Sequence, residues 1–317
     1  MAETIKGIRT AEGVAQIDYD ALSNKPVIVN PNLLDNWYFG NPVNQRGLTK
    51  YTNINGNTQY YIDRWRGRTG THVVTVTGDA LKIESQSTAY STYFEQAFEY
   101  PLNSQGAVTL TVLAKSLLGN SAYAQPIYKD NSYGSAIALK EGLNSKTYKD
   151  NKEISRVLIQ IDKGATLEIK AVKLELGDTQ TLAHQDADGN WVLNEIPDYA
   201  EQLARCQRYQ LRIGHKKEST YVSTLATGFA YNTTSICFLI PTPVSMRTNP
   251  SVVYFDAATI SSLTAKGGGA SLGISAITTV AHENGILLVA TVSGAIANQT
   301  YALYLSSTAG IILDANL

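Results

Sequence analysis

The segment AVTLTVL (Ala107–Leu113) decides the fold, because apolar and β-branched side chains alternate along it with a period of two. This period places successive side chains on opposite faces of a strand, so the segment predicts a half-buried β-strand. The same alternation recurs in HVVTVT (His72–Thr77), Val157–Ile161 and Leu167–Leu176, with glycines between such segments. Many short strands separated by turn signals predict a jelly-roll β-sandwich over residues 32–178.

A second β-rich region occupies residues 209–317. Ser235–Ile240 and Val252–Phe255 are predicted strands, and from residue 259 onward charged side chains are almost absent. A small β domain so poor in charge is expected to be covered on more than one side. The sequence therefore predicts a C-terminal β-sandwich that trimerises.

A connector with one helix, residues 179–208, joins the two regions. Asp188-Gly189 is a turn signal between Leu182–His184 and Trp191–Leu193, which predicts a small hairpin. Pro197–Tyr209 is the one predicted helix, with its proline at the first helical position, acidic residues near its start and basic residues near its end. Its narrow apolar stripe packs either on its own sheet or on symmetry mates around a threefold axis. The predicted fold class is thus all-β with a single connecting helix.

The first 31 residues lack helical periodicity, and Pro26 and Pro31 bracket the apolar triplet Val27–Val29. Such a segment predicts an extended arm with one short strand. It is too small to bury a core of its own, so it is expected to dock on a neighbour, with a frayed terminus as the alternative.

The bulk composition argues against nucleic-acid binding and membrane insertion. With 26 basic and 27 acidic residues in 317, the chain has no broad basic field to attract nucleic acid. No apolar segment approaches the ~20 residues that cross a bilayer, so membrane insertion is not expected. The 19 tyrosines, against 6 phenylalanines and 3 tryptophans, suit half-wet positions such as subunit interfaces and sugar-contacting loops. Cys206 and Cys237 are predicted to be free thiols rather than a bridge.

No catalytic motif is present, so we predict a protein without enzymatic activity and without a required cofactor. Glycoside hydrolysis remains the rival, because two carboxylates about 5–10 Å apart are sufficient for it and can come from anywhere in a fold. The acids of the first predicted sandwich that would serve a capsule depolymerase are Asp63, Glu84, Glu95 and Glu99.

Aromatic and polar side chains cluster at Trp37–Phe39 and at Tyr60–Arg66. Sugar rings stack on aromatic faces and pair with polar groups, so these clusters indicate a sugar site, with filling of the core by the two tryptophans as the alternative. SAYAQPIYKDNSYGS (Ser121–Ser135) is predicted to be a loop that exposes its tyrosines. The predicted glycan contacts are Tyr123, Tyr128, Tyr133, Trp37, Trp65 and Arg66.

Three segments resemble the carbohydrate-binding-module-like jelly-roll domain that recurs in tail proteins of bacteriophages and prophages. They are NLLDNWYFGNPVNQRG (Asn32–Gly47), YYIDRWRG (Tyr60–Gly67) and VKLELG (Val172–Gly177). IPDYAEQLARCQRYQ (Ile196–Gln210) is similar to the helical connector that follows this domain, and FLIPTPVSMRTNPSV (Phe238–Val252) resembles the β segment downstream of it. The resemblance implies a jelly roll that binds sugars in some members and serves as scaffolding in others.

TIKGIRTAEGVAQIDYDALSNKP (Thr4–Pro26) resembles a phage attachment leader. The resemblance therefore implies a tail-fibre or receptor-binding protein of the virion, assembled in the host bacterial cytoplasm as a homotrimer. Its expected partners are other virion proteins, through the arm of residues 1–31, and host surface polysaccharide. A purely structural head fibre, collar or tail adaptor is the alternative. Related modules also hold a structural calcium, and the matching positions are Asn32, Asp35 and Glu175.

Overall fold

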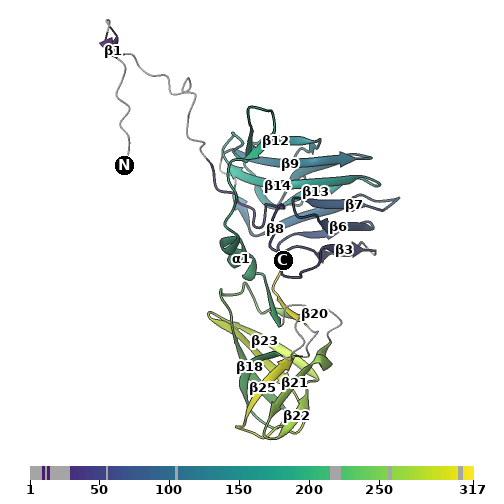
Figure 1. Cartoon of the computed structure of the whole chain (residues 1–317), viewed down its shortest axis with the longest axis vertical. Coiled ribbons are helices and arrows are strands. Elements are labelled where there is room, and N and C mark those ends of the chain that lie inside the picture. The colour runs from purple at the N-terminus through teal and green to yellow at the C-terminus, as the bar shows by residue number, and fades with distance from the viewer. Residues whose placement is uncertain are drawn as a thin grey trace.

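The computed structural model describes residues 9–10, 13–14, 29–54, 56–103, 106–214, 223–255, 259–305 and 310–317. Within them, two β-sandwiches stack end to end, with the helix beside their junction (Figure 1). Most of the predicted attachment arm, residues 1–31, lies outside the described residues. The exceptions are its last residues and the paired strands β1 (Arg9–Thr10) and β2 (Gly13–Val14).

The first sandwich consists of two six-stranded antiparallel sheets, ordered β12-β9-β14-β7-β6-β3 and β11-β10-β13-β8-β5-β4. The first sheet contains β3 (Lys50–Asn53), β6 (His72–Val76), β7 (Leu81–Ser85), β9 (Val108–Leu118), β12 (Gly142–Tyr148) and β14 (Thr166–Leu176). The second contains β4 (Gln59–Tyr60), β5 (Arg66–Arg68), β8 (Thr92–Asn103), β10 (Ala122–Tyr128), β11 (Ile137–Ala138) and β13 (Glu153–Ile161). The predicted all-β sandwich is confirmed.

Aromatic rings fill the centre of this sandwich. Trp65 stacks on Phe94 with ring centroids 5.1 Å apart, and Phe39 meets Trp65 edge to face at 5.3 Å. All three side chains are fully buried. The Trp65 indole also donates a hydrogen bond of 2.9 Å to the Asn36 carbonyl, which satisfies its one polar atom inside the core.

One predicted loop is a strand. β10 occupies most of the tyrosine-rich segment, although it contains Pro126. Proline is tolerated there because β11 pairs only with Tyr123 and Ala124, so no β11 residue needs the missing N–H, and the Pro126 carbonyl accepts the Gly134 N–H at 2.9 Å. The loop prediction for this segment was wrong because a proline between tyrosines is more typical of a loop than of a strand.

The connector contains the predicted hairpin, β15 (Ala183–Gln185) and β16 (Trp191–Leu193). The helix α1 (Tyr199–Gln207) begins two residues later than predicted, because the Asp198 side chain accepts the Glu201 N–H at 2.9 Å and so caps the first turn. Gln202 on α1 accepts the Asn36 N–H at 2.7 Å. The helix therefore packs on the first sandwich of its own chain.

Both cysteines are free thiols, as predicted. Cys206 is buried on the inner side of α1, and burial raises its pKa well above the usual value. In the described residues, no helix has the length and apolar content that crossing a membrane requires.

The second sandwich packs a seven-stranded sheet, β22-β21-β25-β18-β19-β24-β23, against a three-stranded sheet, β17-β26-β20. Phe238 and Leu288 from the larger sheet and Ile311 and Leu313 from the smaller one belong to its core. The larger sheet contains β18 (Ser223–Ala230), β19 (Ser235–Pro241), β21 (Leu263–Gly267), β22 (Ala270–Gly273), β23 (Ala276–His282), β24 (Gly285–Thr291) and β25 (Thr300–Leu305). The smaller contains β17 (Gln210–Gly214), β20 (Ser251–Phe255) and β26 (Gly310–Asp314), and the 3-10 helix η2 (Ile260–Ser262) precedes β21.

Polar side chains join the two sandwiches. The Arg208 guanidinium, directly after α1, contacts both oxygens of Glu99 on the first sandwich at 2.8–3.1 Å. Gln45 donates to the Asp63 carboxylate at 2.6 Å and to the Gln210 carbonyl at 2.6 Å. The junction is therefore held by directed hydrogen bonds, which fix its geometry more narrowly than apolar contact alone.

Candidate functional site

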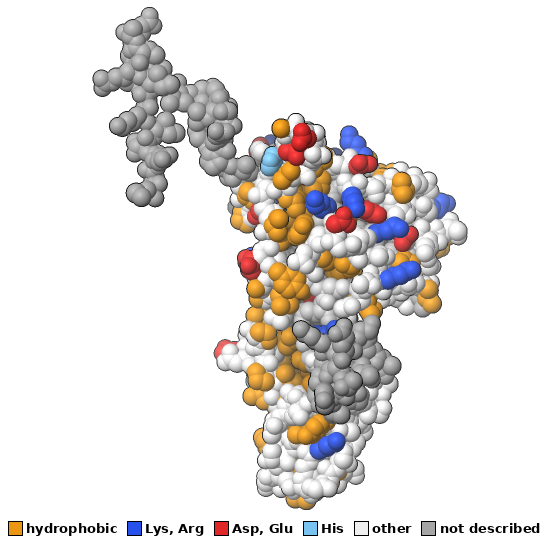
Figure 2. Space-filling model, viewed as in Figure 1, with side chains coloured by type: hydrophobic (Ala, Val, Ile, Leu, Met, Phe, Trp, Pro, Cys, Tyr) orange, Lys and Arg blue, Asp and Glu red, His pale blue; other side chains and the backbone are white. Residues whose placement is uncertain are grey.

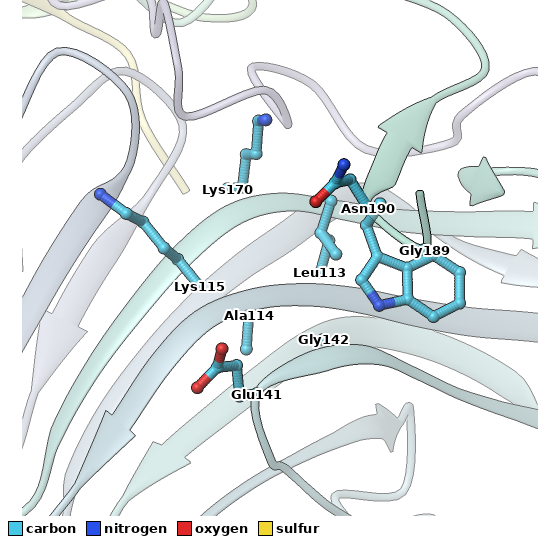
Figure 3. Close-up of a pocket in the computed structure, with 9 residues that line it drawn as sticks. Leu113, Ala114, Lys115, Glu141, Gly142, Lys170, Gly189 and Asn190 are labelled. Atoms are coloured by element: carbon cyan, nitrogen blue, oxygen red, sulfur yellow. The ribbon is translucent and has the colours of Figure 1, made fainter. Parts of the chain in front are cut away.

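An open groove lies where the hairpin β15–β16 meets strands β9, β12 and β14. Its volume is about 580 Å3. Figure 3 shows lysine side chains on one side of this groove and Glu141 on the other, with the sheet as its floor. The lining residues are Leu113, Ala114, Lys115, Glu141, Gly142, Lys170, Gly189, Asn190 and Trp191.

Trp191 provides the aromatic surface of the groove. It is the first residue of β16 and is half-buried, with part of its ring packed against the core of the first sandwich. The ring lies over Gly142, where an added Cβ would approach the indole Nε1 to 3.0 Å. Gly142 also has a φ of +93°, so glycine is required there for backbone geometry as well as for space. In the described part of the chain, the indole N–H has no hydrogen-bond partner, which leaves it available to a ligand.

A tight turn holds Trp191 in place. Asp186 accepts the backbone N–H groups of Asp188 at 3.0 Å and of Asn190 at 2.8 Å. Gly189 supplies a φ of +82°. This aspartate-centred turn is the local reason why the Asp-Gly pair closes the hairpin, and it brings Asn190 and Trp191 to the groove together.

Lys115 reaches the groove from a register shift in β9. Ser116 pairs with Glu168 and Ala114 pairs with Ile169, so Lys115 is an extra residue on its strand. An extra residue bends a strand and re-aims its side chain. The Lys115 ammonium hydrogen-bonds Asp79 at 2.8 Å, which raises its pKa, and it lies 3.6 Å from Glu168.

Lys170 occupies the next register shift, on β14. Ala114 pairs with Ile169 and Leu113 with Ala171, so Lys170 is the residue without a partner on β9. At this point β14 also changes its other neighbour, because β7 pairs only as far as Ile169. The Lys170 carbonyl instead accepts the Phe39 N–H at 2.9 Å. The two irregularities thus direct two lysines to one groove.

Trp37, Trp65 and Arg66 are not available to a ligand, and their prediction as sugar contacts is corrected. Trp65 is fully buried and Trp37 nearly so, so their ring faces are covered by the core. Arg66 pairs with Glu95 at 2.8 Å and donates to the terminal Leu317 carbonyl at the junction. Aromatic side chains suit both the core of a sandwich and a sugar site. In this protein, Trp37 and Trp65 pack in the core.

The predicted tyrosine contacts are divided among three environments. Tyr128 is 4% exposed and donates its hydroxyl to Asp150, so its main role is packing. Tyr123 is half-buried on the same strand. Tyr133 is 54% exposed, just beyond the strand, and remains accessible to a ligand. None of the three lines the groove at Trp191.

The predicted calcium positions already have protein partners. The Asn32 side-chain oxygen accepts from the N–H of Leu34 at 3.0 Å. Asp35 pairs with Arg64 at 3.0 Å. Glu175 is fully buried, accepts the Thr181 N–H at 2.8 Å and lies 3.9 Å from the Lys173 ammonium. Across the described ranges, no group of three or more His, Cys, Asp or Glu side chains is placed to hold a metal ion.

The acids considered for hydrolysis do not line the groove. Asp63 is buried at the junction, and Glu95 is buried among arginines. Glu99 binds Arg208, and Glu84 pairs with Lys82 at 3.0 Å. The carboxylate that does line the groove is Glu141.

No protein-family model matches this chain. No curated protein matches it either. Among solved structures, the chain is similar to PfGH50B at 11% identity and a TM-score of 0.26, over 70% of this chain and 39% of that one. It is similar to an exo-β-agarase at 12% identity and a TM-score of 0.30, over 74% and 40%. It is also similar to a Paenibacillus sp. cycloisomaltooligosaccharide glucanotransferase at 10% identity and a TM-score of 0.20, over 84% and 48%. The chain spans less than half the length of each, and similarity at this level assigns no function.

Proposed function

We propose that this chain is a non-enzymatic carbohydrate-binding protein whose ligand stacks on Trp191. The observation that carries the proposal is the half-buried indole over Gly142, with its N–H unpartnered within the described residues. Sugar rings present apolar C–H faces that pack on aromatic rings, and their hydroxyls pair with amides and carboxylates. Asn190 and Glu141 supply those groups beside the ring.

The form of the groove supports binding more than hydrolysis. It is an open depression of about 580 Å3 on the sheet. Glu141 is its lining carboxylate, whereas glycoside hydrolysis uses a pair of carboxyl groups flanking the scissile bond. An open groove suits a segment of an extended polysaccharide, which enters and leaves along its length.

At the level of the particle, we propose a fibre or receptor-binding protein of a tailed-phage virion that attaches to host surface polysaccharide as a homotrimer. Its N-terminal arm would contact other virion proteins. The resemblance of Asn32–Gly47 and Thr4–Pro26 to phage tail segments supports this assignment. Several weak sugar sites in one particle would hold it to a cell by avidity.

An apolar sheet face supports the trimer. Leu239 pairs with Leu287, which in turn pairs with Val280, so these three side chains form a row on the outer face of the seven-stranded sheet. Phe229 lies on the same face, and Phe229, Leu239 and Val280 are 52%, 54% and 40% exposed. In the view of Figure 2, charged side chains gather on the first sandwich and are sparse on the second. Association with further copies would cover this face.

The glycan proposal is tested on an array of bacterial surface glycans, followed by calorimetry with a binding glycan. Trp191→Ala should lower affinity roughly tenfold, the scale of one aromatic stacking contact. Val192→Ala is the matched control, because Val192 follows on the same strand and is 41% exposed. Its affinity should equal that of the natural protein. Silence across the array would contradict glycan binding and favour a structural virion role.

The trimer is tested by mass measurement in solution. The natural protein should contain three chains, and Leu239→Glu should dissociate it without unfolding the first sandwich, because the new charge falls on the apolar face. A clean monomer of the natural chain at micromolar concentration would contradict the trimer.

A further inference from the structure

The groove beside Trp191 is electrically asymmetric. Lys115 is compensated by Asp79 at 2.8 Å and by Glu168 at 3.6 Å. Lys170 is half-buried and makes no ion pair with any described residue. Figure 3 places Lys170 and Glu141 on opposite sides of the groove. Among the described residues, one side therefore presents an ammonium without an ion-pair partner and the other a carboxylate without one.

Lys170 is unusual because it has no pairing partner on the neighbouring strand β9. The residue falls on a bulge where β14 changes neighbours, and its side chain is directed to the groove rather than to a partner strand. The Lys170 ammonium has no counter-ion among the described residues, so an anion from outside can form a charge-assisted hydrogen bond with it without displacing an existing partner. Lys115, at the neighbouring register shift, lies on the same side of the groove, but Asp79 and Glu168 already compensate its charge, so Lys170 is the cation left for a ligand.

We infer that the ligand is an acidic glycan, with a carboxylate-bearing sugar residue that pairs with Lys170 while a neighbouring ring stacks on Trp191. This inference rests on the proposed glycan-binding function and names its ligand class. Glu141 orients the ligand, because it repels a carboxylate and accepts hydrogen bonds from neutral hydroxyls. The acidic group therefore lies toward Lys170 and the neutral sugars toward Glu141.

The test uses oligosaccharides containing glucuronic, galacturonic or sialic acid, each beside its carboxyl-reduced form. The reduced form keeps the ring and loses only the charge. At least one acidic member should bind the natural protein about tenfold more tightly than its reduced partner, the scale of a charge-assisted hydrogen bond. This preference should weaken as salt rises, because exposed and half-exposed charges are screened.

Three variants separate the roles. Lys170→Gln should remove the preference for the acidic form while leaving affinity for the reduced form unchanged. Glu141→Gln should strengthen binding of the acidic form. Lys163→Gln, at an exposed turn of the same sandwich outside the groove, is the charge-matched control and should bind as the natural protein does. Trp191→Ala should weaken both forms equally.

The outcomes distinguish the two proposals. Equal affinity for acidic and reduced partners, or a preference that survives Lys170→Gln, overturns the acidic-ligand inference and leaves glycan binding in place. Binding only of neutral glycans on the array overturns it as well. Absence of binding to every acidic, reduced and neutral glycan overturns both proposals.

Discussion

Asp63 sits inside the junction and should make the stability of the protein depend on pH in a direction opposite to that of most carboxylates. Its carboxylate is fully buried and accepts the Gln45 N–H at 2.7 Å, the Gln45 amide at 2.6 Å and the Gln210 amide at 3.1 Å. Burial raises the pKa of Asp63 from 3.8 to about 6, although the hydrogen bonds from Gln45 act to lower it. The perturbation we consider is Asp63→Asn, which removes the titrating group.

The size of the effect follows from the two pKa values. A rise from 3.8 to about 6 is about two pH units, and each unit corresponds to about 1.4 kcal/mol, which gives about 3 kcal/mol. Because the folded-state pKa lies above the unfolded one, the folded protein binds the proton more tightly between them. The stability contributed by protonated Asp63 is therefore fully present below about pH 4 and is lost as pH rises through about 6.

The assay is urea unfolding of the natural protein and of Asp63→Asn across this pH range. The variant lacks only this titration, so the difference in unfolding free energy, natural minus variant, should fall by about 3 kcal/mol from about pH 4 to about pH 7. Asp79→Asn is the control, because the hydrogen bond from Lys115 lowers the pKa of Asp79 below 3.8, so its contribution is lost only as pH falls below about 4 and the difference should stay nearly constant from about pH 4 to about pH 7. A difference for Asp63→Asn that does not change with pH would refute a raised pKa and the burial from which it is derived.

Two further predictions concern the groove and the tyrosine strand. Gly142→Ala should lower stability by roughly 1 kcal/mol in urea unfolding, because of its positive φ. It should also weaken glycan binding in calorimetry, because the new Cβ would meet the Trp191 indole at 3.0 Å; unchanged binding would mean that the ring position is not critical. Tyr128→Ala should lower the melting temperature clearly, whereas Tyr133→Ala should change stability by less than about 0.5 kcal/mol, since only Tyr128 is buried. Equal effects would contradict their assignment to core and surface.

The alternating segments could be predicted from sequence because their signal is local. The alternation of residue types along Ala107–Leu113 indicates which face of the strand each side chain occupies, and the structure contains β9 there. The hairpin at Asp188-Gly189 is equally local, since the turn is made by the residues that predict it. Free thiols at Cys206 and Cys237 also agree with the structure.

The site could not be predicted in the same way. Trp37 and Trp65 carry the composition of a sugar site, but whether an indole faces solvent depends on what packs against it from distant segments, such as Phe94 against Trp65. The sequence predicts Trp191 only as part of a hairpin. The one sequence signal for it is a tryptophan two residues after an aspartate-glycine pair, where the turn itself gives no reason for a large apolar ring.

The groove lysines show why register is the missing information. Lys115 and Lys170 are far apart in sequence, and each looks like an ordinary solvated lysine on the outer face of a strand. They line the same groove because the pairing of β9 with β14 shifts register twice within a few residues. Each shift leaves one lysine without a pairing partner. A regular ladder between Ser116–Glu168 and Leu113–Ala171 would pair Lys115 with Ile169 and Lys170 with Ala114, which would turn the two lysines to opposite faces of the sheet. The two irregularities instead bring both lysines to the groove beside Trp191, where Asp79 and Glu168 compensate Lys115 and Lys170 is left without an ion-pair partner among the described residues.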